Sequence, residues 1–261
     1  RITLGAQRDG DKVTYSWEHA YPTASYLVTV NIADFVRRED ESASGIPLRN
    51  YFPRELADRA ETVFAIQAEM MDYFIETFGP YPFDVYGAVV ADVNLPFALE
   101  TQTLSLFGRD IVQGRWGGRS NAEGVIAHEL AHQWFGNSVT PASWRDIWLN
   151  EGFATYAQIL WTEHKYGKAE ADKMLLSYYV AINGAAFNIA GAVTPGDPPP
   201  ARMFDMAVYL RGAWTLHALR LNIGDEAFFA LLRAYAERFM YGSATTDDFI
   251  TLAEEISGDS L

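Results

Sequence analysis

The pattern of apolar and polar residues in the first third of the chain predicts β-strands followed by a helix. Residues 13–17 and 25–33 are rich in Val, Ile, Tyr and Thr and partly alternate between apolar and polar positions, which is typical of strands. Between residues 54 and 78 apolar side chains recur at helical spacing. Gly79 followed by Pro80 is a stop signal for this predicted helix.

The pattern then changes from strands to helices. Residues 85–91 and 101–107 predict two more strands, whereas from about residue 120 onwards the apolar positions follow the helical period. Thr246 is placed to cap a last helix over residues 247–256. Turn residues predict breaks between these helices at residues 136–143, at residues 191–200 and at Gly224. A mixed sheet followed by packed helices is an α+β arrangement.

The composition indicates a folded protein that does not bind nucleic acid. Hydrophobic residues make up 49% of the 261 residues and aromatic residues 14%, unlike the composition of disordered chains. The 34 acidic and 20 basic residues give a net charge of −14, and no run of Lys and Arg suggests a nucleic-acid or membrane face. An acidic surface mildly favours cationic partners, although many proteins carry one for solubility alone.

Sequence features that report on location are few. The absence of cysteine excludes disulfides and thiolate metal sites and is compatible with a cytoplasmic or a secreted protein. No stretch of about 20 apolar residues and no basic-then-apolar leader is present. The chain begins with Arg1 in the middle of a pattern, so we expect a soluble fragment whose flanking domains are missing.

The residues that carry chemistry begin with an H-E-x-x-H motif at residues 128–132, within an apolar stretch that predicts a helix. Residues four apart on a helix lie one above the other, so His128 and His132 can bind one ion. Zinc accepts neutral histidine nitrogen, and a catalytic zinc site has three protein ligands. Glu129 does not share the face of the two histidines, but it can accept a proton from a water molecule beside the ion.

A third ligand is expected from residues 150–156, which predict the start of another helix with Glu151 in its first turn. The connection over residues 136–149 is long enough for that helix to fold back beside the first. Two histidines and one glutamate are a ligand set of hydrolytic zinc sites. The sequence therefore predicts a zinc site formed by His128, His132 and Glu151.

The segments HELAHQWFGN at residues 128–137 and WLNEGFA at residues 148–154 closely resemble the aminopeptidase N-like zinc peptidases. Val139, Thr140, Trp144 and Asp146 extend the match between them. This family, the gluzincins, also includes a leukotriene hydrolase that is an aminopeptidase as well. The resemblance implies a thermolysin-like catalytic domain, made of a small mixed sheet and a helical subdomain, with one zinc ion per chain.

The family also has a G-x-M-E-N strand whose glutamate holds the free α-amine of the substrate. Residues 97–101, with the sequence FALET, resemble it, which implies that Glu100 binds the substrate ammonium and that Ala98 lies beside the substrate. Phe97, Leu99 and Thr101 depart from the family pattern. Composition alone favours a different role for Glu100, that of a solvated strand residue.

The tyrosine of the family's Y-x-K-G segment stabilises the oxyanion. Residues 209–212 resemble this segment with Arg211 in place of lysine, which implies the same role for Tyr209. His19, His164 and His217 stand in no metal-binding spacing and are expected to be surface or core residues. Asp146 and Asn150 are expected either to support the metal ligands or to cap a helix.

The resemblance implies two parts of the chain: residues 1–36 as the end of an N-terminal β-rich domain, and residues 37–261 as the catalytic domain. It also implies a function, the zinc-dependent release of single amino acids from the N-termini of peptides or small proteins. Two alternatives stay open. Phe97 and Thr101 favour a zinc endopeptidase or a hydrolase of another small substrate if they close the amine site, and the same fold can also serve as a non-catalytic scaffold.

Overall fold

The computed structural model describes residues 5–114, 119–184 and 193–261. Its strands are β1 (Gly5–Asp9), β2 (Lys12–Ser16), β3 (Phe35–Glu41), β4 (Pro47–Pro53), β5 (Ala88–Ala91), β6 (Ser105–Gly108), β7 (Val139–Pro141) and β8 (Gly242–Ala244). Its α-helices are α1 (Ala57–Phe64), α2 (Gln67–Phe78), α3 (Asp110–Gln113), α4 (Arg119–Ala131), α5 (Trp148–Tyr166), α6 (Lys168–Asn183), α8 (Met206–Arg238) and α9 (Thr246–Ser257). Short 3₁₀ helices are η1 (Ser25–Leu27), η2 (Arg54–Leu56), η3 (Trp144–Asp146) and η4 (Pro200–Arg202).

The largest sheet has four strands in the order β3-β4-β5-β6. β3 and β4 are antiparallel, whereas β4, β5 and β6 run parallel. Along β4 the side chains of Leu48, Asn50 and Phe52 are buried in alternation, which directs one face of the strand into the core. The buried amide of Asn50 is satisfied because it donates to Gln67 Oε1 (2.8 Å) and accepts from the backbone N–H of Ala88 (2.8 Å). This mixed sheet, packed with helices, confirms the predicted α+β fold.

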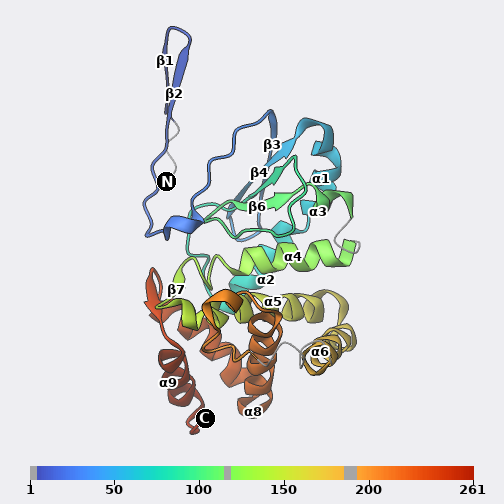
Figure 1. The fold of residues 1–261 in the computed structure, drawn as a ribbon, viewed down its shortest axis with the longest axis vertical. Coiled ribbons are helices and arrows are strands. Elements are labelled where there is room, and N and C mark those ends of the chain that lie inside the picture. Colours follow the sequence, from blue (N-terminus) through green and yellow to red (C-terminus); the bar gives the residue numbers. More distant parts are fainter. Residues whose placement is uncertain (1–4, 115–118, 185–192) are drawn as a thin grey trace.

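The helices form the other half of the molecule (Figure 1). α4 and α5 lie below the sheet in this view, and α6, α8 and α9 lie farther from the sheet. α5 is central because it packs against α4, α6 and α8. Its apolar side chains join one continuous core with the aromatic rings of α2 and of the turn after α4. No helix in the described parts of the chain is long and apolar enough to cross a lipid bilayer.

The predicted strand at residues 25–33 is wrong. Residues 25–27 form η1 instead, and the following segment has no regular structure. Val28, Val30 and Ile32 are 65%, 79% and 92% exposed, and no strand among the described residues pairs with this segment. β-branched composition alone therefore does not make a strand, which needs a partner for its backbone hydrogen bonds.

The helix predicted over residues 54–78 is divided into η2, α1 and α2, and it ends before Gly79 as expected. The two α-helices have different neighbours. Phe64 at the end of α1 packs on Phe52 of β4 and Phe107 of β6, whereas Phe78 at the end of α2 packs on Trp134 beside the helices. The turn between α1 and α2 allows α1 to pack against the sheet and α2 to pack against the helices.

Five strands were not predicted: β1, β3, β4, β7 and β8. β3 has the sequence FVRREDE, in which charged residues on an exposed edge strand hide the apolar pattern. β4 carries the buried Asn50 at a core position, and β8 has only three small residues. The strand predicted over residues 85–91 is reduced to β5, and the one over 101–107 is shifted to β6.

The predicted breaks agree with the structure where it is described. β7 lies within the first break and pairs in parallel with β8, residues 193–199 are irregular, and Gly224 interrupts α8 with a non-helical backbone. Residues 191–192 of the second break lie outside the described residues. The cap of α9 is Thr245 rather than Thr246, since Thr245 Oγ1 and the Asp248 carboxylate form a reciprocal capping box.

Candidate metal centre

α4 brings the two histidines of the H-E-x-x-H motif onto one face. His128 lies in its last turn, and His132 follows the helix end but still donates its backbone N–H to the His128 carbonyl at 3.1 Å. Ile126, Ala127, Leu130 and Ala131 are fully buried, which anchors the opposite faces of the helix. The two imidazole rings are consequently close, with their centroids 4.6 Å apart.

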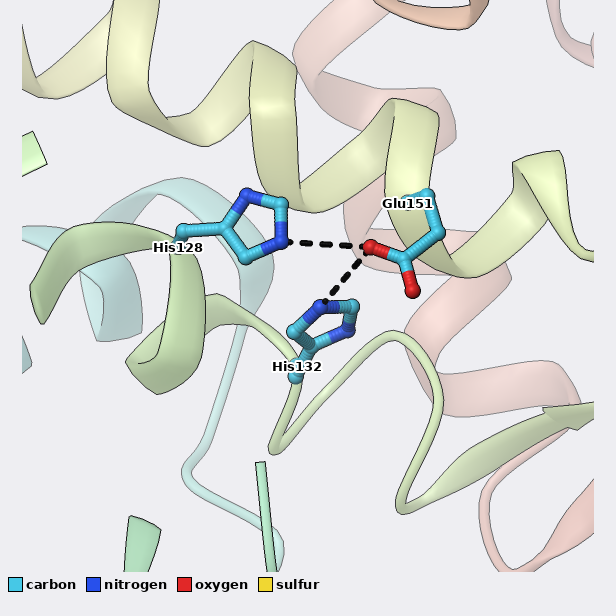
Figure 2. A group of neighbouring side chains, drawn as sticks. All are labelled: His128, His132 and Glu151. Carbon is cyan, nitrogen blue, oxygen red and sulfur yellow. Dashed lines mark hydrogen bonds and ion pairs between the residues drawn. The ribbon is translucent and has the colours of Figure 1, made fainter. Parts of the chain in front are cut away.

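Glu151 in the first turn of α5 completes the group (Figure 2). Its Oε2 lies 3.2 Å from His128 Nε2 and 3.4 Å from His132 Nε2, and the three ligand atoms lie within 4.8 Å of one another. The structure therefore brings together one side chain from α4, one from the turn directly after it and one from α5.

The donor set fits a zinc ion. Two ligand atoms that each lie about 2.0–2.1 Å from a tetrahedral ion are separated by about 3.3 Å, which agrees with the two distances to Glu151. His132 Nδ1 lies 3.0 Å from the carbonyl oxygen of Phe135, so this nitrogen carries the proton and donates it. His132 Nε2 is then unprotonated, and its lone pair faces the Glu151 carboxylate, where it can bind a metal ion. In many metal sites a hydrogen bond at the other ring nitrogen sets the tautomer in this way.

The electrostatics of the group also favour a cation. Burial lowers the pKa of His132, but the carboxylates of Glu100, Glu151 and Glu129 outweigh it and raise the pKa to about 10. Burial disfavours the charged form of Glu151, yet His132 and hydrogen bonds from both imidazoles lower its pKa to about 2. Three buried carboxylates thus face two imidazoles, and this excess of negative charge attracts cations.

Glu129 lies on α4 between the two histidines in sequence and is buried. Its Oε2 has no hydrogen-bond partner among the described residues. Burial raises the pKa of this carboxyl well above its ordinary value, and the negative charges of Glu100 and Glu151 raise it further. A buried acid with a strongly raised pKa beside a metal-ligand set is typical of a catalytic base.

Glu100 is 7% exposed, so the solvated position that composition favours is wrong. The preceding Leu99 forms an antiparallel bridge with Leu106, which turns the segment back toward α4. Burial raises the pKa of Glu100, His132 lowers it and Glu151 raises it, which places Glu100 in the same electrostatic group. Ala98 is half-buried beside it, whereas Phe97 is 50% exposed and turned to solvent.

Tyr209 reaches the group from the first turn of α8. Its ring lies nearly parallel to that of His128, with an angle of 18° and a centroid distance of 6.1 Å. Burial raises the pKa of Tyr209, and the charges of Glu151, Glu100 and Glu129 raise it further, so the hydroxyl stays protonated and can donate a hydrogen bond.

Two glycines bring α5 and α8 together at this point. A Cβ atom added to Gly152 would lie 2.9 Å from Gly212 Cα, and one added to Gly212 would lie 2.8 Å from Gly152 Cα. Gly152 directly follows Glu151, and Gly212 lies one turn after Tyr209. The absence of two side chains therefore sets the distance between the metal-ligand helix and the tyrosine helix, a role that the pattern of the sequence does not reveal.

A further site residue was missed by sequence reasoning. Tyr26 lies in η1, in the segment predicted to be a strand, and its ring packs against Trp144 at a centroid distance of 5.5 Å. Its hydroxyl is buried next to Glu100 and Asn150, and burial raises its pKa together with the charges of Glu100 and Glu151. Nothing in the local sequence distinguishes Tyr26 from the other thirteen tyrosines.

The remaining candidates have structural partners. His19 Nε2 lies 3.0 Å from the amide of Gln102, His164 stacks on Tyr73 at 4.1 Å, and His217 Nδ1 lies 3.3 Å from the Tyr156 hydroxyl. Asp146 Oδ1 accepts from the backbone N–H and the hydroxyl of Thr246. It therefore ties the loop before α5 to α9 instead of facing the histidines.

Comparisons with known proteins also indicate a zinc peptidase. Residues 63–261 match the family described as Peptidase family M1 domain. The chain is 28% identical to "Aminopeptidase M1" of Arabidopsis thaliana over 97% of its length, and 29% identical to "Endoplasmic reticulum aminopeptidase 2" of Homo sapiens over 92%. It covers only 30% and 26% of those two proteins, so it spans less than a third of their length.

A solved structure shares the fold over nearly the whole chain. This M1 zinc metallopeptidase variant from Deinococcus radiodurans, bound to a Tyr-Ser-Ala substrate, superposes with a TM-score of 0.83 and 29% identity. The superposition covers 99% of the present chain and 58% of the solved one. Another variant is bound to L-tryptophan, with a TM-score of 0.81.

We predict that Gly212→Ala destabilises the protein, because the new methyl group meets the backbone of α5 and not a movable side chain. Overpacking of this kind costs about 1–3 kcal/mol. Gly124→Ala is the matched control, since its Cβ would meet only the end of Gln158 at 3.4 Å and alanine favours helix. Urea unfolding should show a loss of stability for Gly212→Ala alone. Equal midpoints for the two variants would contradict the proposed contact.

Proposed function

The chain belongs to the peptidase M1 family, and on this basis we propose that it acts as a zinc-dependent aminopeptidase that releases single amino acids from peptide N-termini. The observation that carries the proposal is the convergence of His128, His132 and Glu151 beside two further buried carboxylates, those of Glu100 and Glu129. The relatives named aminopeptidases and the similar structure with a bound tripeptide support the same activity.

Zinc is the cofactor that the donor set and the family indicate. In the proposed site His128, His132 and Glu151 hold one ion per chain, with both imidazoles neutral and the glutamate ionised. Bound zinc supplies Lewis acidity that polarises the scissile carbonyl and lowers the pKa of water to about 7.

The proton transfers are assigned to Glu129. Its unpartnered Oε2 can accept a proton from the attacking water and then deliver it to the departing amine. Burial supports this role because it raises the pKa of the carboxyl above its ordinary value, which makes Glu129 a stronger base than a solvated glutamate. The Tyr209 hydroxyl, which stays protonated, donates a hydrogen bond to the oxygen that becomes negative during the attack.

The preference for N-termini is assigned to Glu100, with Ala98 beside the substrate. A buried carboxylate has a strong need for a cation, and the ammonium group of an unblocked peptide provides one. If Glu100 holds the ammonium, the first peptide bond is the one that lies over the histidines, and the product is one amino acid. This assignment favours the aminopeptidase over the endopeptidase and over a non-catalytic scaffold.

We further propose that residues 1–36 are the end of a β-rich domain and that residues 37–261 form the catalytic domain. The β1–β2 hairpin supports a separate N-terminal part, since all its side chains are exposed and it projects from the body of the molecule in Figure 1. β3, which begins at Phe35, already pairs with β4 of the four-stranded sheet. Residues 19–27 pack against the catalytic part, so the boundary crosses a contact surface and not a free linker.

The first prediction for the proposed function separates metal binding from catalysis. His132→Ala removes one of three ligands, so most of the bound zinc should be lost, as measured by elemental analysis. Glu129→Gln is the matched variant, because it keeps the shape of the site and should keep zinc while turnover falls by roughly 10²–10⁴. Equal zinc contents in the wild type and His132→Ala would show that the ligand assignment is wrong.

The next prediction concerns Tyr209. Tyr209→Phe deletes one hydroxyl and leaves the ring stacked on His128, so zinc content and the unfolding midpoint should not change. The loss of an oxyanion donor should lower kcat by about 10²–10³. Steady-state kinetics with a peptide substrate measure this, and an unchanged kcat would leave Tyr209 a packing residue.

The last prediction for this site tests Glu100 with Tyr-Ser-Ala and N-acetyl-Tyr-Ser-Ala. A charge-assisted hydrogen bond contributes about 1.5–3 kcal/mol, so Glu100→Gln should lower kcat/KM for the free peptide by roughly tenfold to a hundredfold. The acetylated peptide has no ammonium, and its cleavage should hardly respond. Equal cleavage of both peptides by the wild type would contradict the aminopeptidase assignment.

A further inference from the structure

The backbone that carries Glu100 is bound directly to the extension of the metal motif. The Glu100 carbonyl oxygen accepts hydrogen bonds from Asn137 Nδ2 (2.7 Å) and from Gln133 Nε2 (3.3 Å). The other end of the Gln133 amide, Oε1, accepts from the backbone N–H of Thr103 at 2.9 Å. One glutamine therefore spans the turn from Glu100 to Thr103, and both amides are at most 4% exposed.

The turn itself is strained. Thr103 has a φ of 66°, a left-handed conformation that a β-branched residue rarely adopts. Such a conformation persists only where the surroundings hold it, and it is common at functional sites. Gln133 supplies one restraint through the Thr103 N–H, and a backbone bond from Leu104 to the Thr101 carbonyl (3.0 Å) supplies another.

The opposite side of the turn is held by the N-terminal segment. Gln102 donates its backbone N–H to the Leu27 carbonyl (3.2 Å) and its side-chain amide to the Pro22 carbonyl (3.1 Å). The turn is thus fixed on both sides, and among the contacts of the described residues those from Gln133 and Asn137 come from the segment that also contains His132. These two amides are the direct link between the amine-binding turn and the metal ligands.

We propose that Gln133 and Asn137 are positioning residues that determine the selectivity for a free N-terminus. They fix the Glu100 carboxylate at a set distance from the histidines, so that an ammonium held by Glu100 places the first peptide bond at the reacting residues. Gln133 also donates to the Glu129 carbonyl (3.3 Å), which joins the base to the same unit. The inference rests on the proposed function and adds the residues that set its specificity.

Two variants test the link. Asn137→Ala removes the shorter bond, and Gln133→Met keeps the length of the side chain while removing its three hydrogen bonds. Asn50→Ala is the matched control, because Asn50 is also a buried amide that joins two elements but lies in β4, away from the site. For each protein we would measure zinc content, the melting temperature, and kcat/KM for Tyr-Ser-Ala and N-acetyl-Tyr-Ser-Ala.

We expect Asn137→Ala and Gln133→Met to keep zinc and to lower the ratio of free to acetylated kcat/KM by about tenfold, mainly through KM for the free peptide. Asn50→Ala should lower the melting temperature and leave the ratio unchanged. In the Glu100→Gln background, Asn137→Ala should have no further effect on the ratio, since a positioning residue acts only through the group that it positions.

The outcomes that overturn the inference are distinct from those that overturn the function. If the wild type prefers the free peptide and both folded variants keep that preference, Gln133 and Asn137 have only a structural role. An additional tenfold loss of Asn137→Ala in the Glu100→Gln background would show that Asn137 acts independently of Glu100. If the wild type cleaves both peptides equally, the proposed function fails, and the selectivity assigned to the link fails with it.

Discussion

The burial of three carboxylates in one small space is the constraint on which the rest of the structure depends. Glu100, Glu129 and Glu151 are each at most 7% exposed, and they come from a turn, from α4 and from α5, respectively. Buried charges are costly unless they are paired or neutralised by protonation, so this arrangement favours the binding of cations. The two imidazoles compensate Glu151, whereas burial raises the pKa of the other two acids and the charge of Glu151 raises it further. A zinc ion and a substrate ammonium are the two cations for which the site is suited.

The scaffold keeps these groups together by contacts that leave little freedom. Gly152 and Gly212 allow α5 and α8 to touch at backbone distance, which sets Glu151 against Tyr209. The Asp146 carboxylate joins the start of α5 to α9, and Trp148 Nε1 donates to the same Thr246 hydroxyl at 2.9 Å. Displacement of α5 would therefore break contacts to both α8 and α9 and move Glu151 away from the two histidines.

Sequence reasoning succeeded where the information is local. The four-residue spacing of His128 and His132 depends on a single helix, and Glu151 was expected because its helix start is recognisable. The strand predicted over residues 25–33 failed because pairing is not a local property, and β3 was missed because charges at an exposed edge obscure its pattern. Tyr26 could not be found, since its place beside Glu100 depends on how η1 packs against a turn 74 residues later.

The contrast between local and distant information also explains why the motif of this chain is longer than H-E-x-x-H. Five residues suffice to place two imidazoles and a base, because one helix determines their geometry. Placing a carboxylate from another element at a fixed distance needs side chains that reach out of the helix, and Gln133 and Asn137 reach the Glu100 backbone. Two amide side chains are suited to positioning Glu100, because they bind its backbone without adding charge to a site that already contains three carboxyl groups. In the proposed function, the H-E-x-x-H motif thus carries out the hydrolysis, whereas Gln133 and Asn137, just after it, select the first peptide bond of the substrate.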